Sequence, residues 1–279
     1  MYMIRIVVDS AADCGGMSGI GDWLIPLTVT IGDRDYLDGV ELSADRFYEL
    51  LTTGTEFPKT SQPSPEAYFK VFRKAKRDGD DVLCFTISSA LSGTYQSATI
   101  AKEMVDYDRI HIIDTCAASH LIALLAEFAR KRINEGAAAE VIVAECEALK
   151  KRIRVLAGLD TLAYLQKGGR LGKASAAVGQ IAGIKPIVTF TRDGLVSLCA
   201  KSIGVARAIA SIVSKLQQEQ VDTDFPVYSL YTSGMENVRK LEEKLEQEGI
   251  SVTETRQVGP TIGSHVGPGV YGIIYVIKE

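Results

Sequence analysis

The stretch DVLCFTISSALSGTYQS, residues 81–97, decides the fold of this chain. Its apolar first part, 81–87, predicts a buried strand, and the periodicity of residues 93–105 predicts a helix. The turn between them is rich in hydroxyl groups. A strand, a polar turn and the first turn of a helix direct N–H and O–H donors at one spot, which is typical of a binding site for a small anion.

Two distant stretches have the same chemistry. Residues 60–65 read TSQPSP and residues 259–269 read GPTIGSHVGPG. Both place hydroxyls or an imidazole between residues that interrupt regular structure, so their polar groups lie on tight turns with exposed backbone N–H groups. His265 is the only strongly polar ring in its glycine-rich loop.

Strands and helices alternate around this unit in the first half of the chain. We expect strands at 4–9, 81–87 and 109–113 and helices at 66–76, 92–105 and 117–134. This order predicts an N-terminal α/β domain with a parallel sheet, over residues 1–155. Residues 14–58 interrupt the alternation and are interpreted as an arm or insertion, with one strand at 25–31.

The second half has a different pattern. Strands predicted at 186–191 and 195–201 flank Asp193-Gly194, which is a strong hairpin signal. Further helices are expected at 205–218 and 236–247, and further strands at 227–231, 251–257 and 271–277. We therefore predict a C-terminal α+β domain over residues 156–279.

Composition excludes several classes of protein. The 279 residues carry a net charge of −4, which argues against a nucleic-acid-binding protein. Five cysteines without C-x-x-C spacing favour neither disulfides nor a zinc site. We expect a soluble, cytoplasmic protein, because the N-terminus resembles no leader peptide and no apolar run reaches about 18 residues.

Motifs of catalysis and cofactor binding are weak. Residues 267–272 fit G-x-G-x-x-G, but they lead into the last predicted strand and do not open a helix, so nucleotide binding is not expected. Ser92, His265 and Asp114 could form a hydrolase triad, yet the chain has no G-x-S-x-G motif. Ser92 could equally be a helix N-cap. The three histidines are not spaced as metal ligands, so no metal, cofactor or catalytic residue is assigned.

The ordered motifs resemble the DegV family of bacterial fatty-acid-binding proteins. They are residues 60–64 (TSQPS), 91–98 (LSGTYQSA), 167–170 (KGGR) and 259–269, together with Val8-Asp9-Ser10. The resemblance covers essentially the whole chain. It implies a non-catalytic protein of two domains that holds one long-chain fatty acid between them.

The resemblance also implies a partner and a set of contacts. The partner would be a separate ATP-dependent fatty-acid kinase, which converts the presented carboxylate to acyl phosphate for phospholipid synthesis. The implied carboxylate contacts are Thr60 or its neighbour Ser61, Ser92 with the N–H of Gly93, and His265.

One segment departs from the family pattern. Family members often have a Ser-x-Gly-x-Gly helix start after the third strand, whereas this chain has His120 and Leu121 there. These side chains would occupy space that glycine leaves open, which affects the width of the acyl pocket. The apolar run 121–126 could form the wall of an acyl tunnel or ordinary core.

Positive charge is concentrated in one part of the chain. Residues 150–215 contain 12 Lys or Arg and two acidic residues. Such a segment is usually a solvated face, but it also suits docking to an acidic partner or transient contact with anionic lipid. We predict Lys167, Arg170 and Lys201 as exposed docking residues; alternatively, Arg170 pairs with an acid and braces the domain interface.

Two other functions remain open at this point. One is a hydrolase or acyl-transfer enzyme that uses Ser92 and His265. The other is a regulatory or structural protein that only retains lipid.

Overall fold

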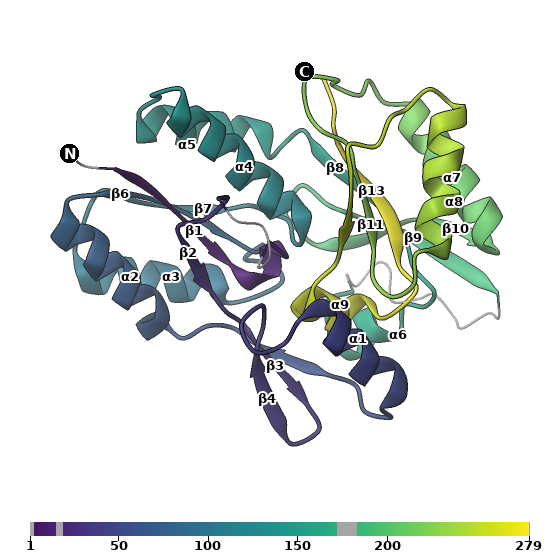
Figure 1. Ribbon diagram of the computed structural model, residues 1–279, viewed down its shortest axis with the longest axis horizontal. Helices are drawn as coiled ribbons and strands as arrows, with labels where there is room; N and C mark the ends of the chain where they lie inside the picture. The colour runs from purple at the N-terminus through teal and green to yellow at the C-terminus, as the bar shows by residue number, and fades with distance from the viewer. Residues whose placement is uncertain (1–2, 15–18, 172–182, 279) are drawn as a thin grey trace.

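Three β-sheets organise the computed structural model, which describes residues 3–14, 19–171 and 183–278 (Figure 1). The first sheet is parallel, with strand order β2-β1-β6-β7, as the sequence predicted. Its strands are β1 (Ile4–Asp9), β2 (Trp23–Ile25), β6 (Asp81–Thr86) and β7 (Ile110–Asp114).

Helices cover both faces of this parallel sheet. Alternate residues of β1 and β6 pack against α2 (Pro65–Asp78) and α3 (Thr94–Val105) on one face. The other face packs against α4 (His120–Asn134) and α5 (Ala139–Leu149). All six residues of β6 are buried because helices cover both faces of the sheet. A strand that is covered on both faces is mainly apolar for this reason.

The second sheet has six strands in the order β10-β9-β8-β13-β11-β12. Its strands are β8 (Ile153–Gly158), β9 (Ile184–Phe190), β10 (Val196–Ile203), β11 (Tyr228–Tyr231), β12 (Glu254–Gln257) and β13 (Tyr271–Val276). The predicted hairpin at Asp193-Gly194 joins β9 to β10. The strand β13 lies in the interior of the sheet, paired with β8 and β11.

The two faces of the second sheet have different neighbours. One face packs against α7 (Val205–Gln217) and α8 (Glu236–Gln247), which lie on the outer side of the molecule (Figure 1). The opposite face shares a single apolar cluster with α4 and the first sheet. The two sheets therefore have a common core, and α4 lies within it.

Part of the predicted arm, residues 28–53, joins β5 in the third sheet and its helix, with strand order β4-β3-β5, and we keep the name arm for this unit. Strand β2 also lies within the expected range 14–58 but belongs to the first sheet. Its elements are β3 (Thr28–Ile31), β4 (Arg34–Leu37), β5 (Lys59–Ser61) and α1 (Ala44–Thr53). The arm contacts α9 (Pro260–Val266), which in turn packs on α6 (Ala163–Lys167) (Figure 1). Residues 60 and 265 are brought together in this way.

Two expected elements have different bounds in the structure. The single strand expected at 25–31 is wrong, because β2 and β3 belong to different sheets and are separated by Pro26 and Leu27. The helix expected from residue 117 begins at His120, since Cys116 and Ser119 have positive φ angles of 52° and 61°. The domain division near residue 155 stays a prediction; the chain changes sheets between α5 and β8.

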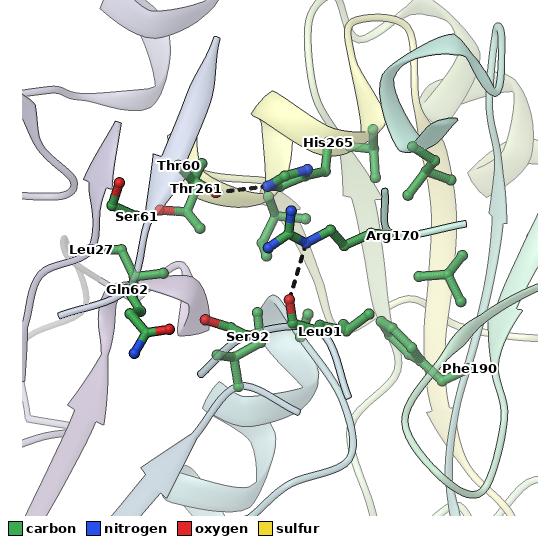
Figure 2. Close-up of a pocket in the computed structure, with 16 residues that line it drawn as sticks. Leu27, Thr60, Ser61, Gln62, Leu91, Ser92, Arg170, Phe190, Thr261 and His265 are labelled. Atoms are coloured by element: carbon green, nitrogen blue, oxygen red, sulfur yellow. Dashed lines mark hydrogen bonds between the residues drawn. The ribbon is translucent and has the colours of Figure 1, made fainter. Parts of the chain in front are cut away.

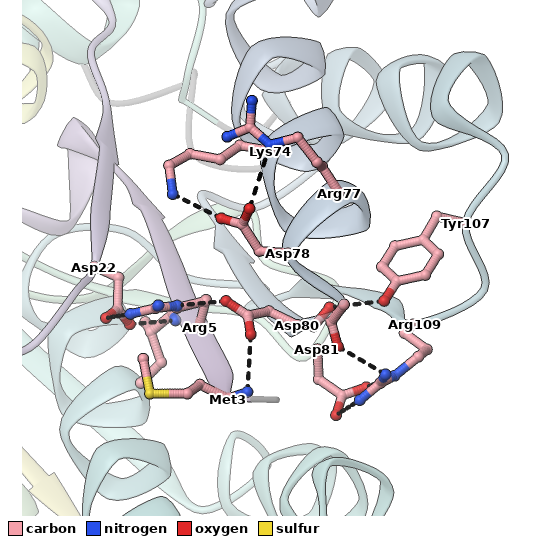
Figure 3. A network of polar contacts seen from close by, with 12 residues as sticks. Met3, Arg5, Asp22, Lys74, Arg77, Asp78, Asp80, Asp81, Tyr107 and Arg109 are labelled. Carbon is pink, nitrogen blue, oxygen red and sulfur yellow. Dashed lines mark hydrogen bonds and ion pairs between the residues drawn. The ribbon is translucent and has the colours of Figure 1, made fainter. Parts of the chain in front are cut away.

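Charged residues fix the amino-terminal edge of the parallel sheet (Figure 3). Asp80 accepts hydrogen bonds from the Met3 N–H and from Arg5 Nε, both at 2.8 Å. Burial of Asp80 acts to raise its carboxyl pKa, but these two donors outweigh burial and lower the pKa. Arg109 forms a bidentate pair with Asp81, at 2.7 and 2.6 Å. This edge is occupied by structural ion pairs, and the carboxyl ends of the strands are left for binding.

Candidate functional site

A cavity of about 330 Å³ lies at the carboxyl end of β6, between the first sheet, the arm and the second sheet (Figure 2). All three polar stretches of the sequence contribute to its wall. Its lining residues are Leu27, Thr60, Ser61, Gln62, Ile87, Leu91, Ser92, Ala118, Leu165, Arg170, Phe190, Val196, Thr261, Ile262, His265 and Val266. We call this cavity the head pocket. Polar groups lie mainly on one side of it and apolar groups on the other.

Thr60 and His265 meet in the head pocket although 205 residues separate them. Thr60 Oγ1 is 2.8 Å from His265 Nε2. Burial lowers the pKa of His265 to about 4, and the nearby charge of Arg170 acts in the same direction. The imidazole is therefore neutral at pH 7, so it can donate or accept one hydrogen bond at each nitrogen according to its tautomer.

Gly168 lies behind the imidazole. A Cβ atom at this position would be 2.3 Å from His265 Nδ1, so only glycine allows the helix α6 to approach the ring so closely. Gly168 therefore supports a pocket residue.

Ser92 lines the head pocket just before the start of α3, and Gly93 follows it. Gly93 occupies the N-cap position, so the alternative role of Ser92 as N-cap is wrong. The hydroxyl of Ser92 lies 2.8 Å from Thr94 Oγ1 and faces the cavity (Figure 2). A Cβ atom at Gly93 would be 2.1 Å from Oε1 of Gln62, whose amide donates to Ser97 Oγ at 3.0 Å.

Arg170 does not have the exposed position that we predicted. Its Nε donates to the Leu91 carbonyl oxygen at 3.0 Å, and another guanidinium nitrogen donates to the Gly168 carbonyl oxygen. Figure 2 shows the guanidinium reaching between His265 and Leu91 into the head pocket. Among the described residues Arg170 forms no ion pair with an acid, and both of these acceptors are backbone carbonyls. No periodic pattern indicates the direction of this side chain, since Arg170 follows a turn.

The other two docking residues are on the surface. Lys167 is exposed, with its Nζ 3.4 Å from the ring centroid of Phe57. Lys201 is exposed on β10. Docking by these residues stays a prediction. Part of the basic segment, including Lys173, lies outside the described residues.

Buried carboxyl groups support the pocket from behind. Asp9 accepts hydrogen bonds from the N–H groups of Ile87 and Ala11, at 2.7 and 3.0 Å. Thr261 donates to Asp38 at 2.5 Å and so links α9 to the arm. Burial raises the pKa of Asp9 to about 7 and that of Asp38 to about 6. Of these residues, the sequence motif had indicated only Asp9.

The hydrolase alternative lacks the contacts of a triad. Within residues 3–14, 19–171 and 183–278, no hydrogen bond joins Ser92 or Asp114 to His265. Asp114 instead accepts hydrogen bonds from the N–H groups of Ser89 and Cys116. Across the same described residues, no group of three or more His, Cys, Asp or Glu is arranged to hold a metal ion.

The two residues that depart from the family pattern lie outside the head pocket. His120 is only 1% exposed, and its Nε2 is 2.8 Å from the carbonyl oxygen of Gln257, so it connects α4 to the second sheet. Leu121 and Leu125 line a second cavity of about 720 Å³. Neither His120 nor Leu121 therefore narrows the head pocket itself.

None of the helices in the described part of the chain is both long and apolar enough to cross a bilayer.

Comparison with known proteins identifies the family. The model of the DegV family, described as an uncharacterised protein family, matches residues 3–278. A DegV domain-containing protein of Caldanaerobacter subterraneus is 34% identical over 283 residues, and the alignment covers 100% of both chains.

Solved structures are similar over the whole length. A DegV family protein from Thermus thermophilus, described as binding fatty acid, is 31% identical with a TM-score of 0.88, covering 99% of this chain and 100% of the other. A stearic acid-binding protein from Eubacterium ventriosum is 27% identical with a TM-score of 0.83, covering 100% of this chain and 99% of the other. The chain belongs to the DegV family, and the predicted combination of a parallel α/β region with an α+β region is confirmed.

Proposed function

We propose that this DegV family member binds one long-chain fatty acid, with the carboxylate in the head pocket, and presents it to a separate kinase. The observation that carries the proposal is the convergence of Thr60, Ser92 and His265 on one partly apolar cavity. Similar solved structures are described as fatty-acid-binding proteins, which supports the same ligand class.

The acyl tail supplies the affinity in this proposal. Burial of a methylene group contributes about 0.8 kcal/mol, so about 15 methylenes contribute up to roughly 12 kcal/mol before the costs of association. The apolar side of the head pocket, which includes Ile87, Leu91 and Val196, is the surface on which this burial begins.

The head group supplies orientation. The hydroxyls of Thr60 and Ser92 and the imidazole of His265 are uncharged donors, with Ser61 beside them in the lining. The N–H of Gly93, next to Ser92 in the chain, is a further proposed donor. Arg170 adds a positive charge that favours the ionised carboxylate. Since the guanidinium is already bonded to the Leu91 carbonyl, it can attract the carboxylate without enclosing it.

An accessible carboxylate is suited to phosphoryl transfer. In the proposed reaction a carboxylate oxygen attacks the terminal phosphorus of ATP held by the kinase, and ADP leaves as acyl phosphate forms. The protein contributes no catalytic group to this step and only holds the nucleophile. Because the kinase needs ATP, we place the protein in the cytoplasm, with Lys167 and Lys201 as docking residues and at most transient contact with membranes.

Lipid analysis of the purified protein tests the binding proposal. Mass spectrometry of the intact protein and of its extracted lipid should find about one fatty acid of roughly 14 to 18 carbons per chain. A nucleotide in its place, or an empty protein that binds no added fatty acid, would contradict the proposal.

Substitution of the head-group residues tests the site. Thr60→Ala combined with Ser92→Ala should weaken binding of a fluorescent fatty acid at least tenfold, because each contact to a charged acceptor contributes about 1.5 to 3 kcal/mol. Thr53→Ala is the matched control, since it removes an exposed hydroxyl that bonds only the Glu49 carbonyl. Equal affinities in the double variant and the control would assign Thr60 and Ser92 a structural role only.

A further inference from the structure

The head pocket is too small for a whole long-chain fatty acid. A cavity of about 150 Å³ accommodates the six carbons of benzene, which is about 25 Å³ per carbon. At that density the head pocket, with its volume of about 330 Å³, holds only about 13 non-hydrogen atoms. A ligand such as stearic acid, with about 20 of these atoms, must extend beyond it.

The second cavity has the volume for the remaining chain and an apolar wall, while its other lining residues include the cations Lys150, Lys151, Arg154 and Arg192. It measures about 720 Å³. We call it the distal pocket. Its apolar wall includes Leu121 and Leu125 of α4 and Ile153 and Val155 of β8. Leu121 and Leu125 belong to the run 121–126, which the sequence analysis interprets as either tunnel wall or ordinary core.

Phe190 contributes to both pockets, at the carboxyl end of β9. Its ring is only partly buried, and in Figure 2 it lies at the side of the head pocket remote from Thr60 and Ser61. The consecutive residues Ala118 and Ala117 likewise line the head pocket and the distal pocket, respectively. The two cavities are therefore neighbours, and the Phe190 side chain stands between them.

The tip of the β9–β10 hairpin fixes the backbone near Phe190. A Cβ atom at Gly194 would be 2.1 Å from Ser88 Oγ and 2.8 Å from the Cα atom of Cys116. Because this turn is packed so closely against the first sheet, movement of the ring is an easier way to connect the pockets than movement of the strand.

We propose that the distal pocket receives the far end of the acyl chain and that Phe190 is the gate between the two pockets, which makes it a determinant of chain length. The inference rests on the proposed binding of a fatty acid in the head pocket. Chains of up to about 11 carbons fit without passing Phe190, and longer chains displace the ring to enter the distal pocket.

Affinities for decanoic acid and stearic acid test the gate. In the parent protein stearic acid should bind more tightly, with a gain of up to about fourfold per added methylene. Phe190→Ala joins the pockets, so the ratio of stearic to decanoic affinity should rise at least threefold. Phe190→Trp places a larger side chain between the pockets and narrows the passage, so the ratio of stearic to decanoic affinity should fall at least tenfold.

Two further variants separate the gate from general effects on the fold. Leu125→Phe fills the distal pocket only. It should weaken the binding of stearic acid and change the affinity for decanoic acid by less than twofold. Val196 lines the head pocket only and pairs with Phe190 across the hairpin. Val196→Ala should therefore lower the affinity for both acids by the same factor. Thermal unfolding of each variant identifies any loss of fold.

The outcomes distinguish the inference from the proposed function. An unchanged ratio in folded Phe190→Ala and Phe190→Trp, or unchanged stearic acid binding in Leu125→Phe, overturns the gate while the head pocket is retained. Absence of fatty-acid binding by the parent protein overturns the proposed function itself.

Discussion

Gly168→Ala is expected to damage the binding site even though alanine tolerates the backbone conformation at this position. Gly168 has φ −72° and ψ −12°, which alanine adopts readily. Alanine would by itself stabilise this position by about 0.4 to 1 kcal/mol, through the lower entropy of the unfolded chain. The new methyl group would, however, lie 2.3 Å from His265 Nδ1 and 3.2 Å from the Tyr164 carbonyl oxygen.

Relief of this clash requires the imidazole to move. Overpacking of this kind costs about 1 to 3 kcal/mol, so the free energy of unfolding should fall by about 1 to 2 kcal/mol overall. Movement of the ring also breaks its hydrogen bond to Thr60 and shifts its contact with the ligand carboxylate. Loss of that contact predicts a fatty-acid affinity roughly 10 to 100 times weaker.

A double-mutant cycle isolates the cause. Urea unfolding and titration with a fluorescent fatty acid are measured for the parent, Gly168→Ala, His265→Ala and the double variant. When the ring is absent the methyl group has space, so Gly168→Ala should have little effect on either quantity in the His265→Ala background. An equal effect of Gly168→Ala in both backgrounds would refute the reasoning, because the damage would then not pass through His265.

Three further predictions concern pH and charge. A bound carboxylate should raise the pKa of His265 from about 4, so binding should take up protons once the pH falls toward that raised pKa, and calorimetry in buffers of different ionisation enthalpy should find no such uptake in His265→Gln. Asp80→Asn should lower the free energy of unfolding by about 1 to 3 kcal/mol at pH 7. The lowered pKa of Asp80 stabilises the fold above about pH 4, and this stability is lost on further acidification. The variant and the parent should therefore converge as the pH falls through the lowered pKa; a constant difference would disprove the ionic origin. Lys201→Glu should leave bound fatty acid unchanged and reduce acyl-phosphate formation by a cognate kinase more than the control Lys70→Glu, and equal rates would exclude Lys201 from docking.

The sequence predicted the framework of the fold because local patterns determine it. The apolar run at 81–87 and the turn Asp193-Gly194 each contain their own signal, and both elements were placed correctly. The break between β2 and β3 was missed, since two short strands in different sheets produce one continuous β-branched run.

The site was only partly accessible from sequence for a related reason. The polar turns indicated an anion site, and the family resemblance that they carry implied Thr60, Ser92 and His265, but the direction of a long side chain depends on contacts that are remote in sequence. Arg170 turns inward because the Leu91 carbonyl, 79 residues away, accepts its hydrogen bond. Phe190 could not be identified from the sequence as a residue between two pockets, because the pockets form only when segments that are remote in sequence come together.

The interior position of β13 also has a consequence for how the protein is made. The second sheet cannot close until residues 271–276 have been synthesised, because β13 separates β8 from β11. Until then, both of these strands have an unpaired edge, and unpaired strand edges promote aggregation in partly folded chains. The first sheet, whose strands are complete by Asp114, can form on the ribosome much earlier. Folding of this protein therefore has a vulnerable interval between the two sheets, during which a chaperone that shields β8 and β11 would raise the yield.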